Sequence, residues 1–525
     1  MIVLAVKIIL LVAFFGVMIG VGLYCRRHAT DVNGFVLGGR NVGPWLTAFA
    51  FGTSYFSAVI FVGYAGQFGW NFGVASTWIG LGNAFIGSLL PWAILGRRTR
   101  ILTQHLGSRT MPDYFGLRYK SPAMKTIASV IVFLFLIPYT ASLFNGLSRL
   151  FTMAFPGVDY AVCVIVMAVL TGVYVIVGGY MATAINDFIQ GIIMLVGIVA
   201  TIVAVLSING GLMGSLEKVV TEAGASGAEG WKFASFLGPD PVFLLFVVIL
   251  TSLGTWGLPQ MVGKFYSIRD EADIKKGTII STFFAIVVAG GCYFLGGFAR
   301  AFLTPEGGKP VGGFDNVIPT MLSGLPEILI AIVLVLVLSA SMSTLSSLVL
   351  TSSSTITLDL ISPMTKKELT EKKKMLIMRV FIAFFIVLSA VIAIVQAKSN
   401  VVFIAQLMGV SWGALSGAFL APFLYGLYWK KTTRAGCYAS FIFGVGMSLL
   451  QLVKSLTGFS FGVSFLDGLV FKTSLHSGSI AMLCGLIIVP VVSLLSRKTR
   501  PDGVDEMFAC YDKKVEVSQK TSLVD

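Results

Sequence analysis

Charged residues are scarce in this sequence. Asp, Glu, Lys and Arg together make up 12% of its 525 residues, whereas an average soluble domain carries about 25%. Hydrophobic residues account for 56% of the chain. This composition excludes a soluble globular protein, a fibrous protein and a disordered chain, and it predicts a protein that crosses a membrane many times.

Cysteine and histidine are rare as well. The six cysteines are scattered without a CxxC pair, and the three histidines, His28, His105 and His476, lie in or beside loops. The sequence contains no HExxH motif and no pair of acidic residues inside an apolar run. These absences argue against a disulfide framework, against a Cys/His metal cluster and against the alternative of an intramembrane enzyme.

Apolar runs long enough to cross a bilayer as helices are numerous, because about 20 residues suffice. Thirteen occur, at 2–24, 43–68, 75–96, 125–153, 159–178, 187–207, 240–262, 277–303, 325–355, 378–396, 401–428, 436–453 and 476–496. Of the 38 Lys and Arg residues, 29 lie in alternate connections on one side, Lys264 among them. The positive-inside rule places that side in the cytoplasm, the N-terminus outside and the C-terminus inside. The net charge of +14 is therefore a topology signal, and no nucleic-acid partner is expected.

Two of the runs predict interrupted helices. Gly52–Ala58 mixes small, hydroxyl and aromatic residues, and Thr251–Gln260 contains Pro259 with flanking glycines, which tolerate an unwound backbone. The two segments lie five spans apart and enter the membrane from opposite sides, as an inverted five-plus-five repeat requires. The predicted units are 1–42 (a peripheral first helix and cytoplasmic loop), 43–207 (the first repeat, spans 2–6), 208–239 (an extracellular loop), 240–428 (the second repeat, spans 7–11), 429–496 (peripheral helices 12 and 13) and 497–525 (a cytoplasmic tail).

The ninth run carries a high density of hydroxyl groups. At about 100° per residue, one helix face holds Ala340, Ser343, Thr344 and Ser347, with Ser346 beside them. These hydroxyls, together with carbonyls freed by a broken helix, could give a hard cation its oxygen ligands. The alternative is that each hydroxyl bonds back to the carbonyl four residues earlier and that the small side chains serve close helix packing.

Asp187 is the clearest acidic residue at or inside a membrane boundary, because it opens the run 187–207. A carboxylate in this position is energetically costly and indicates a functional residue. The alternative is a helix cap, since Asp at a helix start accepts hydrogen bonds from free main-chain N–H groups. Both interpretations remain open at this point.

These residues resemble the sodium:solute symporter family, and within it the proline and pantothenate types. The resemblance runs from Gly34 to about residue 435 and is most specific at Thr53–Gly63, 178–190, Gly257-Leu258-Pro259 and Ala340–Asp359. It implies an all-α membrane protein of LeuT-like fold. It also implies a sodium site made by the carbonyls of Thr53, Phe56 and Ala340 with the hydroxyls of Ser343 and Thr344. Some members bind a second sodium ion through residues matched here by Asp187, Ser343, Ser346 and Ser347, whereas in others this Asp lies on the sodium exit path. The resemblance therefore implies one or two sodium ions.

The substrate pocket departs from the family pattern. Proline-type members have an Asp two residues before the serine matched by Ser57, and aromatic residues where this chain has Val59 and Thr251. The residues expected to line the pocket are Tyr55, Ser57, Val59, Tyr139, Thr255 and Trp256. Hydroxyls and freed helix N-termini favour a solute that carries a carboxylate.

The sequence thus predicts a sodium-coupled symporter of the plasma membrane that works by alternating access. The expected cargo is sodium, the only metal, with a small organic solute such as an amino acid, a pantothenate-like acid or a monocarboxylate. We expect the chain to function as a monomer in the lipid bilayer and not to be an enzyme. The alternatives are a passive channel, which would call for charged rings or a filter repeated by subunits, and a sodium symporter of a sugar-type solute.

Overall fold

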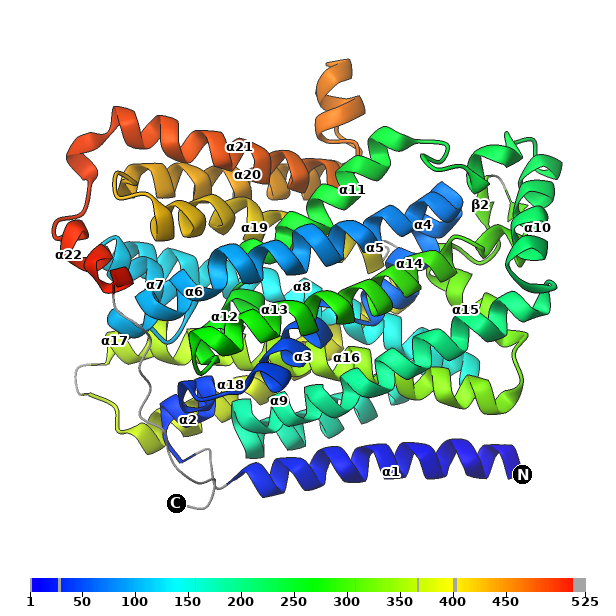
Figure 1. The fold of residues 1–525 in the computed structure, drawn as a ribbon, viewed down its shortest axis with the longest axis horizontal. Coiled ribbons are helices and arrows are strands. Elements are labelled where there is room, and N and C mark those ends of the chain that lie inside the picture. Colours follow the sequence, from blue (N-terminus) through cyan, green and yellow to red (C-terminus); the bar gives the residue numbers. More distant parts are fainter. Residues whose placement is uncertain are drawn as a thin grey trace.

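The computed structural model describes residues 2–26, 30–155, 157–306, 308–365, 368–399 and 404–512. Most of these residues form a bundle of helices that run roughly side by side, with short helices and connections at both ends (Figure 1). The helices are α1 (Ile2–Cys25), α2 (Val32–Leu37), α3 (Pro44–Tyr55), α4 (Ala65–Phe72), α5 (Thr77–Ala84), α6 (Leu90–His105), α7 (Met111–Arg118), α8 (Pro122–Ala154), α9 (Tyr160–Ile208), α10 (Gly211–Ala225), α11 (Pro241–Leu253), α12 (Pro259–Ser267), α13 (Glu271–Ala285), α14 (Gly291–Gly296), α15 (Val317–Ser323), α16 (Glu327–Thr355), α17 (Ser362–Met364), α18 (Glu371–Ser399), α19 (Ile404–Tyr428), α20 (Arg434–Thr457), α21 (Ser474–Leu495) and α22 (Val504–Phe508). Strands β1 (Pro305–Glu306) and β2 (Lys309–Pro310) pair as a small antiparallel hairpin.

Ten of the described helical segments are long and apolar enough to cross a membrane, and the pair α11 and α12, bent by 41°, makes an eleventh. The prediction of thirteen spans differs because two segments are unusually long. Residues 59–105 form one segment of 47 residues, and α9 has 49. A straight helix of that length would measure about 74 Å, more than twice the thickness of a hydrocarbon core.

The chain doubles back within α9. The helix is broken at Gly179, where φ is 58° and ψ is −151°, a conformation that favours glycine. Tyr174, before the break, lies against Gly22 of α1, and Asn186, after it, donates to the carbonyl of Met18 on the neighbouring turn of α1. The predicted runs 159–178 and 187–207 are therefore both helical, but the second helix begins directly after Gly179.

A similar turn divides residues 59–105. Gly73 has a φ of 60°, and Gly69 before it packs on Gly296, whereas Gly80 after it packs on Gly290. A Cβ atom on Gly69 would collide with the main chain of Gly296. Glycine is therefore required at this close approach of α4 and α14.

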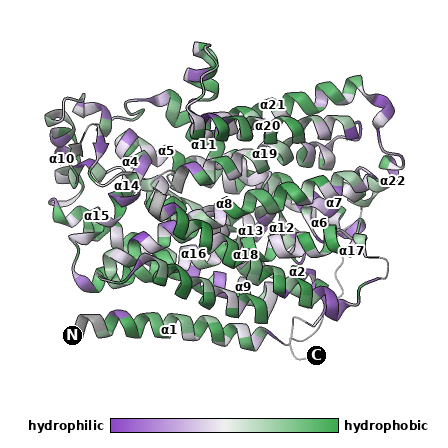
Figure 2. Ribbon diagram, turned by 180° about the vertical axis from the view of Figure 1, so that it is seen from behind, coloured by the Kyte–Doolittle hydropathy of each residue, from purple (hydrophilic) through white to green (hydrophobic). Residues whose placement is uncertain are grey.

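The outer surface of the bundle is apolar. Hydrophobic residues run along α1, α9 and α21 in Figure 2, and large side chains such as Ile9 and Val12 on α1 are more than half exposed. A surface of this kind fits the hydrocarbon of a bilayer and shows a multi-pass membrane protein.

The segment 208–239 is more ordered than the predicted loop. It contains α10 and a short turn of 3₁₀ helix, η6 (Gly230–Ala234), and packs beside the β-hairpin at one end of the bundle (Figure 1). The start of α1 lies at this end, and α22 lies at the opposite end.

Candidate functional site

The first helix break separates α3 from the π-helical turn η3 (Val59–Tyr64). The last hydrogen bond of α3 runs from the N–H of Phe56 to the carbonyl of Gly52, and Phe56 itself is extended. The hydroxyl of Ser57 then accepts from the N–H of Val59 at 3.2 Å. Unwinding here frees the Thr53 carbonyl to meet groups from another helix.

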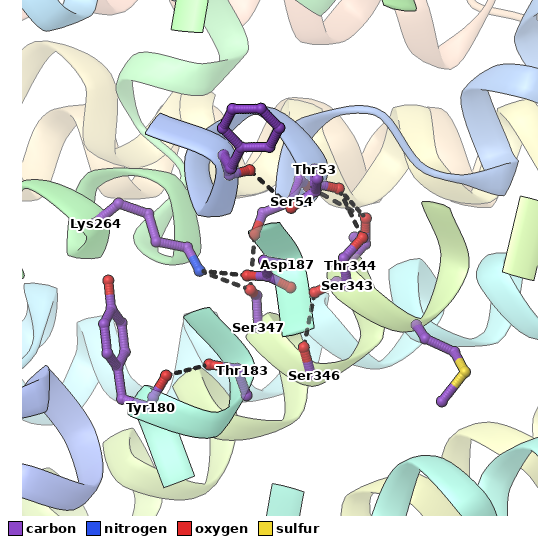
Figure 3. A network of polar contacts seen from close by, with 12 residues as sticks. Thr53, Ser54, Tyr180, Thr183, Asp187, Lys264, Ser343, Thr344, Ser346 and Ser347 are labelled. Atoms are coloured by element: carbon purple, nitrogen blue, oxygen red, sulfur yellow. Dashed lines mark hydrogen bonds and ion pairs between the residues drawn. The ribbon is translucent and has the colours of Figure 1, made fainter. Parts of the chain in front are cut away.

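The hydroxyl face of α16 meets this freed carbonyl. Thr53 O accepts from Ser343 Oγ and from Thr344 Oγ1, each at 3.1 Å (Figure 3). Both hydroxyls also lie within 3.2 Å of the carbonyl of Ala340. Four of the five residues predicted for the first sodium site are therefore in direct contact, and the fifth, Phe56, lines a small apolar cavity together with Ala340.

This oxygen cluster has more acceptors than protons. Ser343 Oγ has three carbonyls within hydrogen-bond distance and Thr344 Oγ1 has three, but each hydroxyl carries a single proton. The alternative interpretation expected each hydroxyl to bond to the carbonyl four residues earlier. Ser343 and Thr344 do make these bonds, and they make them in addition to their contacts with α3. An excess of uncharged oxygen acceptors in a buried place suits a monovalent hard cation.

Asp187 lies next to this cluster on α9 and is fully buried. Its Oδ2 is 3.6 Å from the ammonium of Lys264 on α12. Lys264 also donates to Ser347 Oγ at 2.9 Å, and Ser347 Oγ lies 2.7 Å from Ser54 Oγ of α3. A continuous polar chain thus links Asp187 to the first helix break, as Figure 3 shows.

The proposal that Asp187 caps a helix does not hold. The residue lies inside α9, two turns after Gly179, and its carboxylate accepts no hydrogen bond of ordinary length from the described part of the chain. Of the other residues predicted for a second sodium ion, Ser346 donates to the carbonyl of Ser343 at 2.8 Å. Asp187 and Ser347 are joined through Lys264.

Three predicted substrate residues lie at or against the first break. Ser57 and Val59 form the break, and the ring centroid of Tyr55 lies 6.0 Å from that of Trp412 on α19. Tyr139 of α8 packs edge-on against the same Trp412 at 6.0 Å. Trp412 was absent from the prediction, although it is the one aromatic side chain among small residues in 409–418.

Thr255 and Trp256 are the other two predicted substrate residues. They belong to the second helix break, the turn between α11 and α12 that contains η7 (Gly254–Trp256). Thr255 donates to the carbonyl of Gly87, and Trp256 donates its indole N–H to the carbonyl of Ile86, both at 2.9 Å. Their polar atoms are thus bonded to the turn η5 (Phe85–Leu89).

A small hollow, partly open to solvent, borders the polar chain. Its lining includes Lys264 and Ser347 together with Leu37 and Arg109. Leu37 and Arg109 lie in the two connections, 25–42 and 97–124, that belong to the lysine- and arginine-rich side. The hollow therefore joins that end of the bundle to the residues around Asp187.

Lys264 is a second functional candidate that the sequence did not predict. It was counted in a cytoplasmic loop because the apolar run before it ends at residue 262. The structure places it in α12 with 3% of its surface exposed. A signal was present in its position five residues after Pro259, because Pro259 begins a new helix there.

Comparison with known proteins gives consistent results. Residues 35–444 match the model of the sodium:solute symporter family. A sodium/proline symporter of Staphylococcus aureus (strain bovine RF122 / ET3-1) is 30% identical over 445 residues, which cover 83% of this chain and 84% of that protein. The protein of the same name from strain JH9 is similar to the same extent.

A solved structure resembles the whole bundle. A Na⁺-coupled sialic acid symporter in a substrate-bound outward-open state superposes with a TM-score of 0.71 at 17% identity, over 93% of this chain and 98% of that one. This likeness shows the LeuT-like fold that the sequence predicted.

Proposed function

The chain belongs to the sodium:solute symporter family, and we propose that this sodium-coupled symporter imports a small, carboxylate-bearing organic solute by alternating access. The observation that carries the proposal is the excess of oxygen acceptors where Ser343 and Thr344 meet the Thr53 carbonyl. A sodium ion at this point would hold the broken α3 against α16. Sodium and solute would then each raise the affinity of the other by the same factor.

The proposed topology keeps thirteen spans. Residues 59–105 complete the second span and form the third, and the two parts of α9 are the fifth and sixth. The N-terminus is outside, the C-terminus is in the cytoplasm, and the chain functions as a monomer in the plasma membrane. In this orientation the hollow that ends at Lys264 opens to the cytoplasm, and the inward membrane potential favours sodium entry by about 2.3 kcal/mol per charge per 100 mV.

The proposed solute follows from the residues around the first break. Tyr55 stands where the proline type has an acidic residue, so the pocket lacks that partner for a substrate ammonium. Hydroxyl and aromatic groups from Ser57, Tyr139 and Trp412 surround the break. The curated relatives named sodium/proline symporters support an amino acid or a similar small carboxylate as the class to test first.

The test begins with the purified full-length chain. Its thermal unfolding is measured with L-proline, other amino acids, monocarboxylates and pantothenate, each in sodium chloride and in choline chloride. A solute that stabilises the protein only in sodium is then used for uptake into proteoliposomes. Uptake should require an inward sodium gradient, and uptake that is indifferent to that gradient would contradict symport. A passive channel would instead show flux that does not saturate with solute.

A further inference from the structure

A positive charge of the protein itself lies at the predicted second sodium site. The Lys264 ammonium lies between Asp187 and Ser347, at 3.6 Å from the carboxylate Oδ2 and 2.9 Å from the hydroxyl (Figure 3). Asp187 and Ser347 are two of the four residues expected to hold a second sodium ion. All three side chains are buried, so the ammonium and an ion would compete for one carboxylate.

The contact between Lys264 and Asp187 is loose. At 3.6 Å it is longer than a hydrogen bond, and neither carboxylate oxygen accepts one from the rest of the described chain. The pair Lys454–Asp467 at the bundle surface, by comparison, is within hydrogen-bond distance, with 2.6 Å between nitrogen and oxygen. There the lysine holds the pKa of Asp467 well below its ordinary value. Asp187, in contrast, keeps free lone pairs that a small cation can use.

Lys264 also lines the solvent-accessible hollow beside Asp187. Lys264 and Ser347 line the hollow, whereas Asp187 does not. The ammonium is therefore one of the groups that an ion in the hollow would meet next to Asp187. Lys264 belongs to α12, which packs mainly on α3 and α6, whereas Asp187 belongs to α9 and Ser347 to α16. A shift of α12 relative to α9 would separate the two charges.

We propose that Lys264 is a tethered cation that alternates with a sodium ion at Asp187. The inference rests on the proposed sodium symport. In the conformation described here the ammonium neutralises the carboxylate. Sodium binds Asp187, Ser346 and Ser347 only after Lys264 has withdrawn. The carboxylate is thus never left without a counter-charge in the apolar interior, where an unpaired charge is strongly destabilising.

Equilibrium binding of ²²Na⁺ to the purified full-length chain tests this inference, because it needs no solute. K264Q removes the competing charge, so we expect either one additional bound sodium per protein or a fall of at least tenfold in the half-saturating sodium concentration. K264R keeps the charge and should retain the wild-type curve. K454Q removes the surface ion pair with Asp467 and is the matched control. It should also leave the sodium-binding curve unchanged.

Combining K264Q with a substitution of Asp187 is the decisive test. In a D187N background, K264Q should have no effect on sodium binding, because the group for which the two cations compete is gone. An unchanged curve for K264Q alone, or an equal gain in the D187N background, would overturn the inference. A failure of the proposed function would look different. In that case the S343A and T344A variants would bind sodium as the wild type does.

Thermal unfolding measures whether the K264Q variant is folded. Without the ammonium, the bare carboxylate of K264Q should make the protein depend on sodium for stability. We expect sodium to raise the unfolding temperature of K264Q by more than that of the wild type, relative to N-methylglucamine. A variant that is equally unstable in both salts would show a purely structural role for Lys264 and would overturn the inference.

Discussion

The main-chain groups at the two helix breaks are satisfied in different ways. At the first break, the Thr53 carbonyl is approached by two hydroxyls that have several other acceptors within reach. At the second break, the Gly254 carbonyl accepts from Ser416 Oγ at 2.6 Å. Thr255 and Trp256 donate in turn to carbonyls of η5.

This difference indicates a division of roles between the two breaks. The first break keeps oxygen acceptors in excess, which a cation can use. The second break is closed by hydrogen bonds to α19 and η5 and is therefore anchored to its surroundings. The short helix that begins at Pro259, directly after the second break, places Lys264 next to Asp187.

The packing of the second break against α19 can be disrupted at Gly257. We expect this change to have the largest effect of the three. A Cβ on Gly257 would lie 2.8 Å from the main-chain nitrogen of Leu420 and 2.9 Å from Cα of Ser416. Since main chain cannot move aside, Gly257→Ala should destabilise the protein by about 3 kcal/mol. Thermal unfolding of the purified protein measures this. Gly263→Ala, in the following helix α12, is the control, because its Cβ meets nothing within 4 Å, and it should be neutral or stabilising. Equal losses in both variants would contradict the anchoring.

The proposed ion-binding role of the first break can be tested at Thr344. Removing one oxygen ligand of a cation resembles loss of a hydrogen bond to a charged group, about 1.5–3 kcal/mol. Thr344→Ala should therefore raise the half-saturating sodium concentration about tenfold or more. Ser416→Ala removes the hydroxyl that closes the second break, so it should leave the sodium requirement unchanged. A sodium shift of the same size in Ser416→Ala would show that the two breaks do not differ in this way.

Local chemistry made much of the site predictable from the sequence. Helix breaks depend on glycine, proline and hydroxyl residues at the break itself, and the face of α16 follows from helix geometry. Both therefore appear in a single stretch of sequence, such as Gly52–Ala58 or Ala340–Ser347. The residues that make these features are the ones that the structure brings together at Thr53, Ser343 and Thr344.

Long-range pairing was not predictable in the same way. A lysine beyond the end of an apolar run is assigned to a loop by hydropathy, and only the fold shows that Lys264 meets Asp187. Trp412 was missed for a similar reason, because its contacts with Tyr55 and Tyr139 come from three different helices. The start of the second half of α9 also depended on a backbone angle at Gly179, which hydropathy does not record.

A hydrogen bond joins the two breaks, and its loss should have the smallest of the three effects. Tyr55, the last residue of α3, donates its hydroxyl to the Thr251 carbonyl of α11 at 2.5 Å. Hydrogen bonds between helices in a membrane contribute about 0.6 kcal/mol on average, so Tyr55→Phe should lower the free energy of unfolding by about that amount. Tyr114→Phe is a matched control, because Tyr114 is equally buried and its hydroxyl has no hydrogen-bond partner in the described part of the chain. If the breaks are independent, Tyr55→Phe leaves sodium binding unchanged. A tenfold weaker affinity would instead show that the anchored second break holds the first in its ion-binding shape.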